Sequence, residues 1–204
     1  MAKKSKKNIG NKNSKDTCIA VLMTCHNRCD KTLRCLAALH DQDLPEGVTF
    51  RVYLVDDGCV DNTCEEVRST FPLVKILQGD GQLYWCRGMH KAWKEAMKSE
   101  YAYYLWLNDD TILLPKAIGC LLATTSWAKE TGGHSGLIVG SCRDPKTGQH
   151  TYGGRVKRHR FSRLPDKPLA PGGMIMPCDT MNGNVVLVPQ DVAEKIGNLS
   201  TDYT

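Results

Sequence analysis

Short apolar runs alternate along the chain with longer segments in which apolar side chains recur every three or four positions. The short runs predict buried strands, and the periodic segments predict amphipathic helices. The expected strands lie at residues 17–24, 51–55, 74–77, 101–107, 137–140 and 185–188. The expected helices lie at residues 28–41, 87–98, 115–129 and 190–196, with a further one over Glu65–Val67 that Asp61 would cap.

This alternation of strands and helices predicts an α/β fold, in which a mostly parallel sheet carries helices on both faces. The pattern changes after Cys142, where Gly, Pro and basic residues dominate from Arg143 to Gly173. We expect a hairpin near His150–Val156 and then a long loop. No internal repeat or domain linker interrupts residues 17–204, which we interpret as one domain.

The net charge of +5 comes from the start of the chain. Residues 1–16 hold six Lys against Asp16, and residues 17–204 hold equal numbers of basic and acidic side chains. We expect residues 1–16 to be a disordered basic tail that is either simply solvated or attracted to an anionic membrane. A neutral body argues against nucleic acid as a partner.

Ten Cys are present without any C-x-x-C pair. No apolar run is long enough to span a membrane, and the first residues lack the apolar stretch of a secretory signal. We therefore expect reduced, mostly buried thiols in a cytoplasmic protein. A metal site formed by Cys25, His26 and Cys29 is the less favoured alternative.

Three polar clusters directly follow predicted strands, at residues 24–28, 56–58 and 108–110. The carboxyl ends of parallel strands are where ligands bind in open α/β sheets. The adjacent carboxylates of Asp109 and Asp110 repel each other and suit Mg²⁺ or Mn²⁺. The alternatives are that Asp110 or Thr111 caps a turn and that Asp57-Gly58 forms a simple turn.

Several familiar motifs are absent. The sequence has neither G-x-G-x-x-G nor G-x-x-x-x-G-K-[ST], so a metal rather than a glycine loop would neutralise a phosphate. It also lacks G-x-S-x-G, which argues against a serine hydrolase.

The segments at residues 20–28, 55–63 and 107–111 together resemble family-2 glycosyltransferases, which have the Rossmann-like GT-A fold. Residues 79–89 resemble the rhamnosyltransferase-like branch, and residues 181–185 resemble the acceptor-side segment of the family. The first position of the family's D-x-D is Asn108 in this chain, which leaves the charge on Asp109 and Asp110.

The resemblance implies a role for each matching position. Asp110 would bind the metal, Mg²⁺ or Mn²⁺. Trp85 and Arg87 would border the donor sugar and diphosphate, although core packing and a plain surface charge are the alternatives. Asn182, Gly183 and Asn184 would lie on the acceptor side. The full set of implied donor-binding residues is Thr24, Cys25, His26, Arg28, Asp56, Asp57, Trp85, Arg87, Asn108 and Asp109.

The implied activity is that of an inverting, metal-dependent hexosyltransferase. The donor would be a dTDP- or UDP-sugar, and the acceptor a saccharide or lipid-linked saccharide of a cell-surface polysaccharide or glycolipid. Such a protein would be cytoplasmic or peripheral at the inner face of the cell membrane. The basic residues between Arg155 and Arg163 would form a solvated mobile loop, or else close over the diphosphate or meet an anionic acceptor.

The family's catalytic base lies in a later acidic segment. Residues 197–204 reach only the place where that segment would begin, so we expect a truncated chain whose base lies beyond Thr204. Asp202 is a poor substitute so near the terminus. Two other functions stay open, a catalytically inactive nucleotide-sugar binding module and a nucleotidyltransferase.

Overall fold

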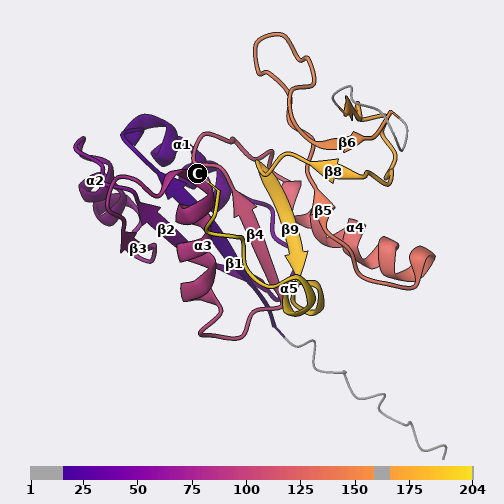
Figure 1. Cartoon of the computed structure of the whole chain (residues 1–204), viewed down its shortest axis with the longest axis horizontal. Helices are drawn as coiled ribbons and strands as arrows, with labels where there is room; N and C mark the ends of the chain where they lie inside the picture. The colour runs from indigo at the N-terminus through magenta and orange to yellow at the C-terminus, as the bar shows by residue number, and fades with distance from the viewer. Residues whose placement is uncertain (1–15, 159–165, 204) are drawn as a thin grey trace, which may run out of the picture.

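A computed structural model describes residues 16–158 and 166–203. Its main sheet has six strands in the order β3-β2-β1-β4-β9-β5 (Figure 1). Their bounds are β1 Thr17–Cys25, β2 Val48–Asp56, β3 Lys75–Gln78, β4 Tyr103–Leu107, β5 Ile138–Val139 and β9 Val185–Pro189. The helices are α1 Cys29–His40, α2 Thr63–Thr70, α3 Tyr84–Ala96, α4 Ala117–Gly132 and α5 Gln190–Ile196.

The predicted α/β fold with a mostly parallel sheet is confirmed. β1 pairs in parallel with β2 and β4, and β2 pairs in parallel with β3. Only β9 runs the other way, antiparallel to both β4 and β5. Because β1, β2 and β4 are parallel, their carboxyl ends lie at the same edge of the sheet, which we call the site edge. The strand order reverses between β1 and β4, which is where ligands bind in open α/β sheets.

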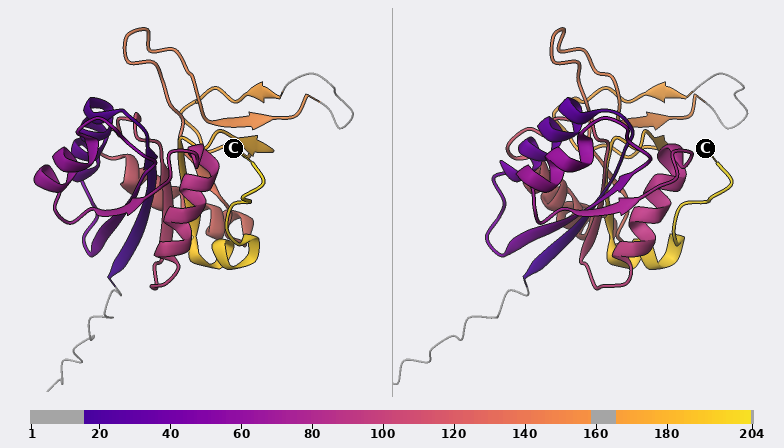
Figure 2. Two further views of the ribbon diagram at one scale, coloured as in Figure 1. Left: turned by 60° about the vertical axis from the view of Figure 1, so that its left-hand side comes forward. Right: turned by 90° about the vertical axis from the view of Figure 1, so that its left-hand side faces the viewer.

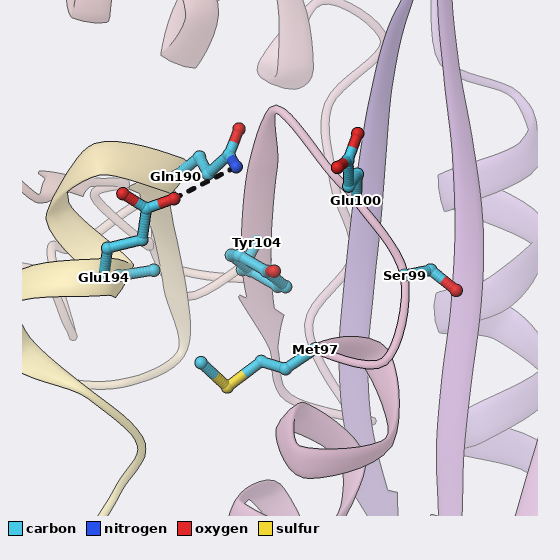
Figure 3. Close-up of a pocket in the computed structure, with 7 residues that line it drawn as sticks. Met97, Ser99, Glu100, Tyr104, Gln190 and Glu194 are labelled. Carbon is cyan, nitrogen blue, oxygen red and sulfur yellow. Dashed lines mark hydrogen bonds between the residues drawn. The ribbon is translucent and has the colours of Figure 1, made fainter.

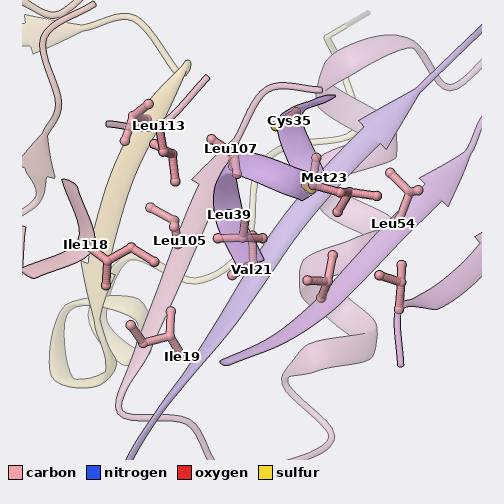
Figure 4. Close-up of a cluster of buried hydrophobic side chains, with 14 of the residues drawn as sticks. Ile19, Val21, Met23, Cys35, Leu39, Leu54, Leu105, Leu107, Leu113 and Ile118 are labelled. Carbon is pink, nitrogen blue, oxygen red and sulfur yellow. The ribbon is translucent and has the colours of Figure 1, made fainter. Parts of the chain in front are cut away.

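Helices cover both faces of this sheet, as the sequence predicts. Alternate residues of β1 point to opposite faces, and both sets are buried because β1 is a central strand. One set, with Val21 and Met23, packs under α1, α2 and α4 (Figure 4). The other set, with Ala20 and Leu22, packs under α3 and α5. Packing on both faces holds the strands in place, and their carboxyl ends carry the candidate site.

The expectation of a hairpin near His150–Val156 is confirmed in part, because antiparallel pairing is present there but extends into a second, three-stranded sheet. Its strands are β6 Gly154–Val156, β7 Lys167–Pro168 and β8 Thr180–Met181, in the order β7-β6-β8. The turn that precedes this sheet is closed by an antiparallel bridge between Arg143 and His150. These strands have at most three residues, too few for a period-two pattern to show in the sequence.

We call residues 141–184 the small-sheet region and residues 17–140 and 185–204 the main-sheet region. The described residues of the small-sheet region stand away from the main sheet on the side of the site edge, whereas the start of β1 lies at the far end (Figure 2). The predicted disordered tail and most of the basic loop, at residues 159–165, lie outside the described residues.

The expectation that the thiols are mostly buried is wrong. All ten Cys are free, but only Cys25 and Cys35 are buried, and Cys120 and Cys178 are exposed. Within the described residues, no helix is long and apolar enough to cross a membrane.

Candidate functional site

The three predicted polar clusters converge at the site edge. Cys25 and Asp56 are register partners at the ends of β1 and β2. The Cys25 carbonyl accepts a hydrogen bond from the Asp57 backbone N–H at 2.9 Å, which holds the two following loops together. Residues 108–110 follow β4 on the other side of β1. Parallel pairing of these strands therefore places all three clusters side by side.

The acidic pair after β4 shares one cation from the loop after β1. Arg28 Nη1 lies 3.3 Å from Asp109 Oδ1 and 3.3 Å from Asp110 Oδ2. Asp109 is almost fully buried, whereas Asp110 is partly exposed. Since two neighbouring carboxylates repel each other, the guanidinium offsets part of that repulsion in this state.

One oxygen of the pair lacks a partner. Asp109 Oδ2 is buried without a hydrogen bond, which is costly for a carboxylate. Burial raises the pKa of Asp109, and Asp110 raises it further, although the neighbouring Arg28 opposes the change. A further positive charge at this site would stabilise the ionised Asp109 carboxylate.

A divalent cation fits the donors that the acidic pair offers. Mg²⁺ is often held by only one or two carboxylates together with waters and substrate phosphates. Asp110 and the unpaired Asp109 oxygen supply such a set. Among residues 16–158 and 166–203, no group of three or more His, Cys, Asp or Glu side chains gathers as a complete metal cage. A cation here would thus depend on ligands from the substrate.

Asp57 is already engaged with the start of α3. Its Oδ1 accepts from the Gly81 N–H at 2.9 Å, and its Oδ2 accepts from Leu83 at 3.0 Å and Tyr84 at 2.9 Å. Tyr84 has a φ of 51°, which is strained for a bulky residue, and its side chain is 61% exposed. Asp57 therefore caps α3 and holds Tyr84 at the site edge, a role that the resemblance does not imply for it.

Asp56 and His26 stabilise the loops that follow β1 and β2. Asp56 Oδ1 accepts from the Cys59 N–H at 2.8 Å, and Asp56 is buried. His26 is exposed, and its Nδ1 meets the Asp57 carbonyl. Cys25 is buried beside Cys59, with their sulfurs 3.9 Å apart. Asp56 and Cys25 are therefore buried beneath the loops of the site edge, while His26 is exposed.

Trp85 ties α3 to the loop after β4. Its indole Nε1–H donates to Asn108 Oδ1 at 2.7 Å, and its ring packs edge-on against Trp106 at 6.2 Å between centroids. A Cβ at Gly183 would stand 2.6 Å from the Trp85 ring, so only glycine fits there. The Asn108 N–H donates to the Asn184 carbonyl at 3.0 Å. The predicted donor-side and acceptor-side residues thus meet directly.

The other predicted residues flank this contact. Thr24 packs against Gly88, where a Cβ would stand 2.4 Å from Thr24 Oγ1, so α3 lies close against β1. Arg87 is partly buried, and its Nε has no hydrogen-bond partner. Asn182 donates from its backbone to the Gly153 carbonyl at 3.0 Å, inside the small-sheet region. Asn182 therefore contacts the small-sheet region, whereas Gly183 and Asn184 contact Trp85 and Asn108.

Two residues at this edge escaped the sequence reasoning. Tyr84 is the exposed, strained start of α3, and Gly88 permits the close approach of α3 to β1. The available signal for Gly88 was a glycine inside the segment predicted to be a helix, residues 87–98. Nothing local signals the strain at Tyr84, because Asp57 imposes it from another strand.

A separate hollow lies between α3 and α5. It is about 180 Å³ and is lined by residues that include Glu100, Tyr104 and Glu194 (Figure 3). These residues adjoin the start of β4 and the start of α5, at the end of β4 opposite Asn108. None of the predicted site residues lines it.

Comparison with known proteins identifies one matching family. Residues 20–176 match the family described as glycosyl transferase family 2. No curated protein matches the chain. Mannosyltransferase PcManGT from Pyrobaculum calidifontis, solved with GDP-Man and Mn²⁺, is similar with a TM-score of 0.54 at 16% identity. The similarity covers 90% of this chain and 48% of that one, so this chain spans about half its length.

S. aureus TarS 1-349 is also similar. Its complex with UDP-GlcNAc has a TM-score of 0.46 at 20% identity, over 53% of this chain and 31% of that one. The family match covers well over half of the chain and includes the three clusters of the site edge as well as Trp85. The chain belongs to glycosyl transferase family 2.

Proposed function

We propose that this chain supplies the donor half of a glycosyltransferase that moves a sugar from a nucleoside diphosphate to an acceptor hydroxyl with inversion. The observation that carries the proposal is the acidic pair at the end of β4, with an unpaired buried oxygen on Asp109 and a cation, Arg28, beside it. Such a group suits a diphosphate bound through a divalent metal. Of the three functions open from the sequence, the family assignment favours this one.

Asp110 and the free Asp109 oxygen would hold Mg²⁺ or Mn²⁺. The metal, when bound, supplies positive charge to the departing diphosphate. PcManGT, the similar structure, was solved with Mn²⁺ and GDP-Man, which supports the choice of both metal and ligand class.

Arg28 would add a second positive charge beside the diphosphate. Its side chain is 48% exposed and its guanidinium already reaches both carboxylates, so it can turn toward an incoming anion without leaving the site edge. Charge placed in advance where negative charge develops lowers the barrier to departure.

Trp85 and Asn108 would form the wall beside the donor sugar. Their mutual hydrogen bond fixes the indole ring, and Gly183 lets the acceptor-side backbone approach that ring. An acceptor hydroxyl would attack the anomeric carbon from the face opposite the diphosphate, with a carboxylate accepting its proton. We assign no described residue to that base.

We also propose an identity for the nucleotide base and the sugar of the donor. The resemblance of residues 79–89 to the rhamnosyltransferase-like branch favours a dTDP-deoxysugar, and UDP- and GDP-sugars are the alternatives. We propose a saccharide or lipid-linked saccharide acceptor and a place at the cytoplasmic side of the membrane.

Calorimetric titration with UDP, dTDP and GDP, each with and without Mn²⁺, tests the donor site. We expect one nucleotide to bind in a metal-dependent manner, and Asp110→Ala to weaken that binding at least about tenfold. Asp41→Asn, an exposed acid at the end of α1, is the matched control and should bind like the unchanged protein. Metal-independent binding, or equal binding by Asp110→Ala, would contradict the proposal.

Release of the nucleoside diphosphate from the matching sugar donor separates a transferase from an inactive binding module. Slow release to water, abolished by Asp110→Ala, is expected of a transferase site. Binding without release, even in the presence of acceptor saccharides, would favour the binding module.

A further inference from the structure

The small-sheet region has a net positive charge, whereas the main-sheet region has a net negative charge. By sequence, residues 141–184 hold eight Lys and Arg against three Asp and Glu. The main-sheet region holds thirteen Lys and Arg against eighteen Asp and Glu. The neutral body is thus divided into a basic projection and an acidic remainder. A charge separation of this kind orients a molecule toward an anionic surface.

The loop from β7 to β8 adds exposed apolar side chains to this basic region. Every residue from 171 to 180 is exposed. Met174 is 77% exposed, Ile175 43% and Met176 36%. An added Cβ at Gly172 or Gly173 would meet no atom within 4 Å, so the loop stands free of the body. Three consecutive apolar residues held in water in this way are unusual for a surface loop.

The loop is firmly anchored at both ends, next to exposed lysines. The Leu169 N–H donates to the Gly154 carbonyl at 2.9 Å, and the Asp179 N–H donates to the Arg155 carbonyl at 2.9 Å. Lys167 precedes the loop on β7, and Lys157 follows β6. Its apolar residues and the lysines therefore belong to one small structural unit.

We propose that the small-sheet region docks on an anionic lipid bilayer, with Met174, Ile175 and Met176 inserted at the headgroup level. Apolar insertion together with attraction of lysines to anionic lipid headgroups gives the two contributions that stable peripheral binding needs. A soluble polyanion would satisfy the lysines but would leave the apolar residues in water. The bilayer is therefore the occupant that uses both features.

Docking there would bring the site edge close to the lipid surface. Gly183 and Asn184 connect β8 of the small sheet to Trp85 and Asn108. The small-sheet region also lies on the side of the site edge (Figure 2). A lipid-linked acceptor would then reach the donor without leaving the membrane. This last step rests on the proposed function, whereas docking itself does not.

Vesicle sedimentation of the full chain tests the docking surface. Vesicles of phosphatidylcholine alone are compared with vesicles that also contain phosphatidylglycerol. We expect binding only to the anionic vesicles, and weaker binding as salt screens the charges. Met174→Ser with Ile175→Ser, and separately Lys157→Gln with Lys167→Gln, should each weaken binding at least about fivefold.

Matched controls in the main-sheet region are Val60→Ser with Leu73→Ser and Lys94→Gln with Lys195→Gln. All four residues are exposed, so these controls change the same chemistry elsewhere and should leave binding unchanged. Equal binding by every variant would assign the interaction to the basic residues 1–16 and overturn the proposal.

Two other results would also overturn the docking proposal. One is the absence of sedimentation with anionic vesicles. The other is binding to dextran sulfate, a soluble polyanion, when vesicles are not bound. Because nucleotide binding is measured separately by calorimetry, failure of docking and failure of the donor site remain distinguishable.

Discussion

The main-sheet region and the small-sheet region are built in opposite ways. The first buries two apolar layers against a six-stranded sheet. The second has strands of two or three residues and a loop that is exposed throughout residues 171–180. Apolar burial stabilises the first region, whereas short strand pairings and turns stabilise the second. The candidate donor site belongs to the main-sheet region, and the close approach of Gly183 to Trp85 joins the small-sheet region to it.

The largest difference between the regions should appear on removal of a leucine side chain. Leu105 is fully buried in β4, so Leu105→Ala should destabilise the fold by about 2–5 kcal/mol through lost burial and a cavity. Leu169, partly exposed beside β7, is the matched position in the small-sheet region. Leu169→Ala should cost less than about 1 kcal/mol. Denaturant unfolding checks both, and equal losses would contradict the contrast.

Two aspartates that accept backbone N–H groups provide the next comparison. Asp57→Asn removes a buried charge that accepts hydrogen bonds from the start of α3, so we expect a loss of about 2 kcal/mol in unfolding free energy. Asp144 accepts similarly from Lys146 and Thr147, but in a solvated turn. Asp144→Asn should lower the Tm far less. If the two variants melt alike, Asp57 is not the cap of α3.

The junction between the regions is tested by adding one methyl group. Gly183→Ala would place a Cβ 2.6 Å from the Trp85 ring, and the resulting shift should cost about 1–2 kcal/mol and weaken nucleotide binding. Gly136→Ala, where an added Cβ meets nothing within 4 Å, is the control. Thermal melts and calorimetry should separate the two variants. A Gly183→Ala protein that melts and binds normally would show that the close contact is not needed.

The smallest expected effect concerns the acid limit of stability in the main-sheet region. Burial acts to raise the pKa of Asp56, but hydrogen bonds from Cys64, Cys59 and Gln78 lower it below its ordinary value. A depressed carboxyl pKa contributes stability above the unfolded-state pKa of about 3.9, and that stability is lost as the pH falls. Asp56→Asn should therefore flatten the fall in Tm as the pH drops below about 5.

Asp43→Asn, an exposed carboxyl after α1, serves as the control for the Asp56 measurement. Its acid profile should follow that of the unchanged protein. An Asp56→Asn profile as steep as this control would contradict the assignment of the acid sensitivity to Asp56.

The sequence predicted the main-sheet region well, because buried strands and helices show apolar runs or periodic apolar positions in the sequence. The apolar run at residues 101–107 marked β4, and the polar residues behind it marked the site edge. It predicted α3 to begin at residue 87, whereas α3 begins at Tyr84. That start depends on Asp57 from another strand, and such a tertiary contact leaves no local pattern.

The candidate site was predicted in part. Asp109, Asp110 and Arg28 do gather, as expected for residues that follow neighbouring parallel strands. The engagement of Asp57 with α3 was not foreseeable, since spacing along the chain does not show which backbone groups a carboxylate will meet. In the small sheet, β7 and β8 were missed because two residues are too few to show alternation.

The most direct test of the central claim is to locate nucleotide binding by amide hydrogen exchange, with and without Mn²⁺ and the nucleotide that calorimetry selects. The account predicts slower exchange at residues 24–28, 56–58 and 108–111, with no change at the hollow beside Tyr104 and Glu194 (Figure 3). Slower exchange at that hollow, with the site edge unaffected, would contradict it.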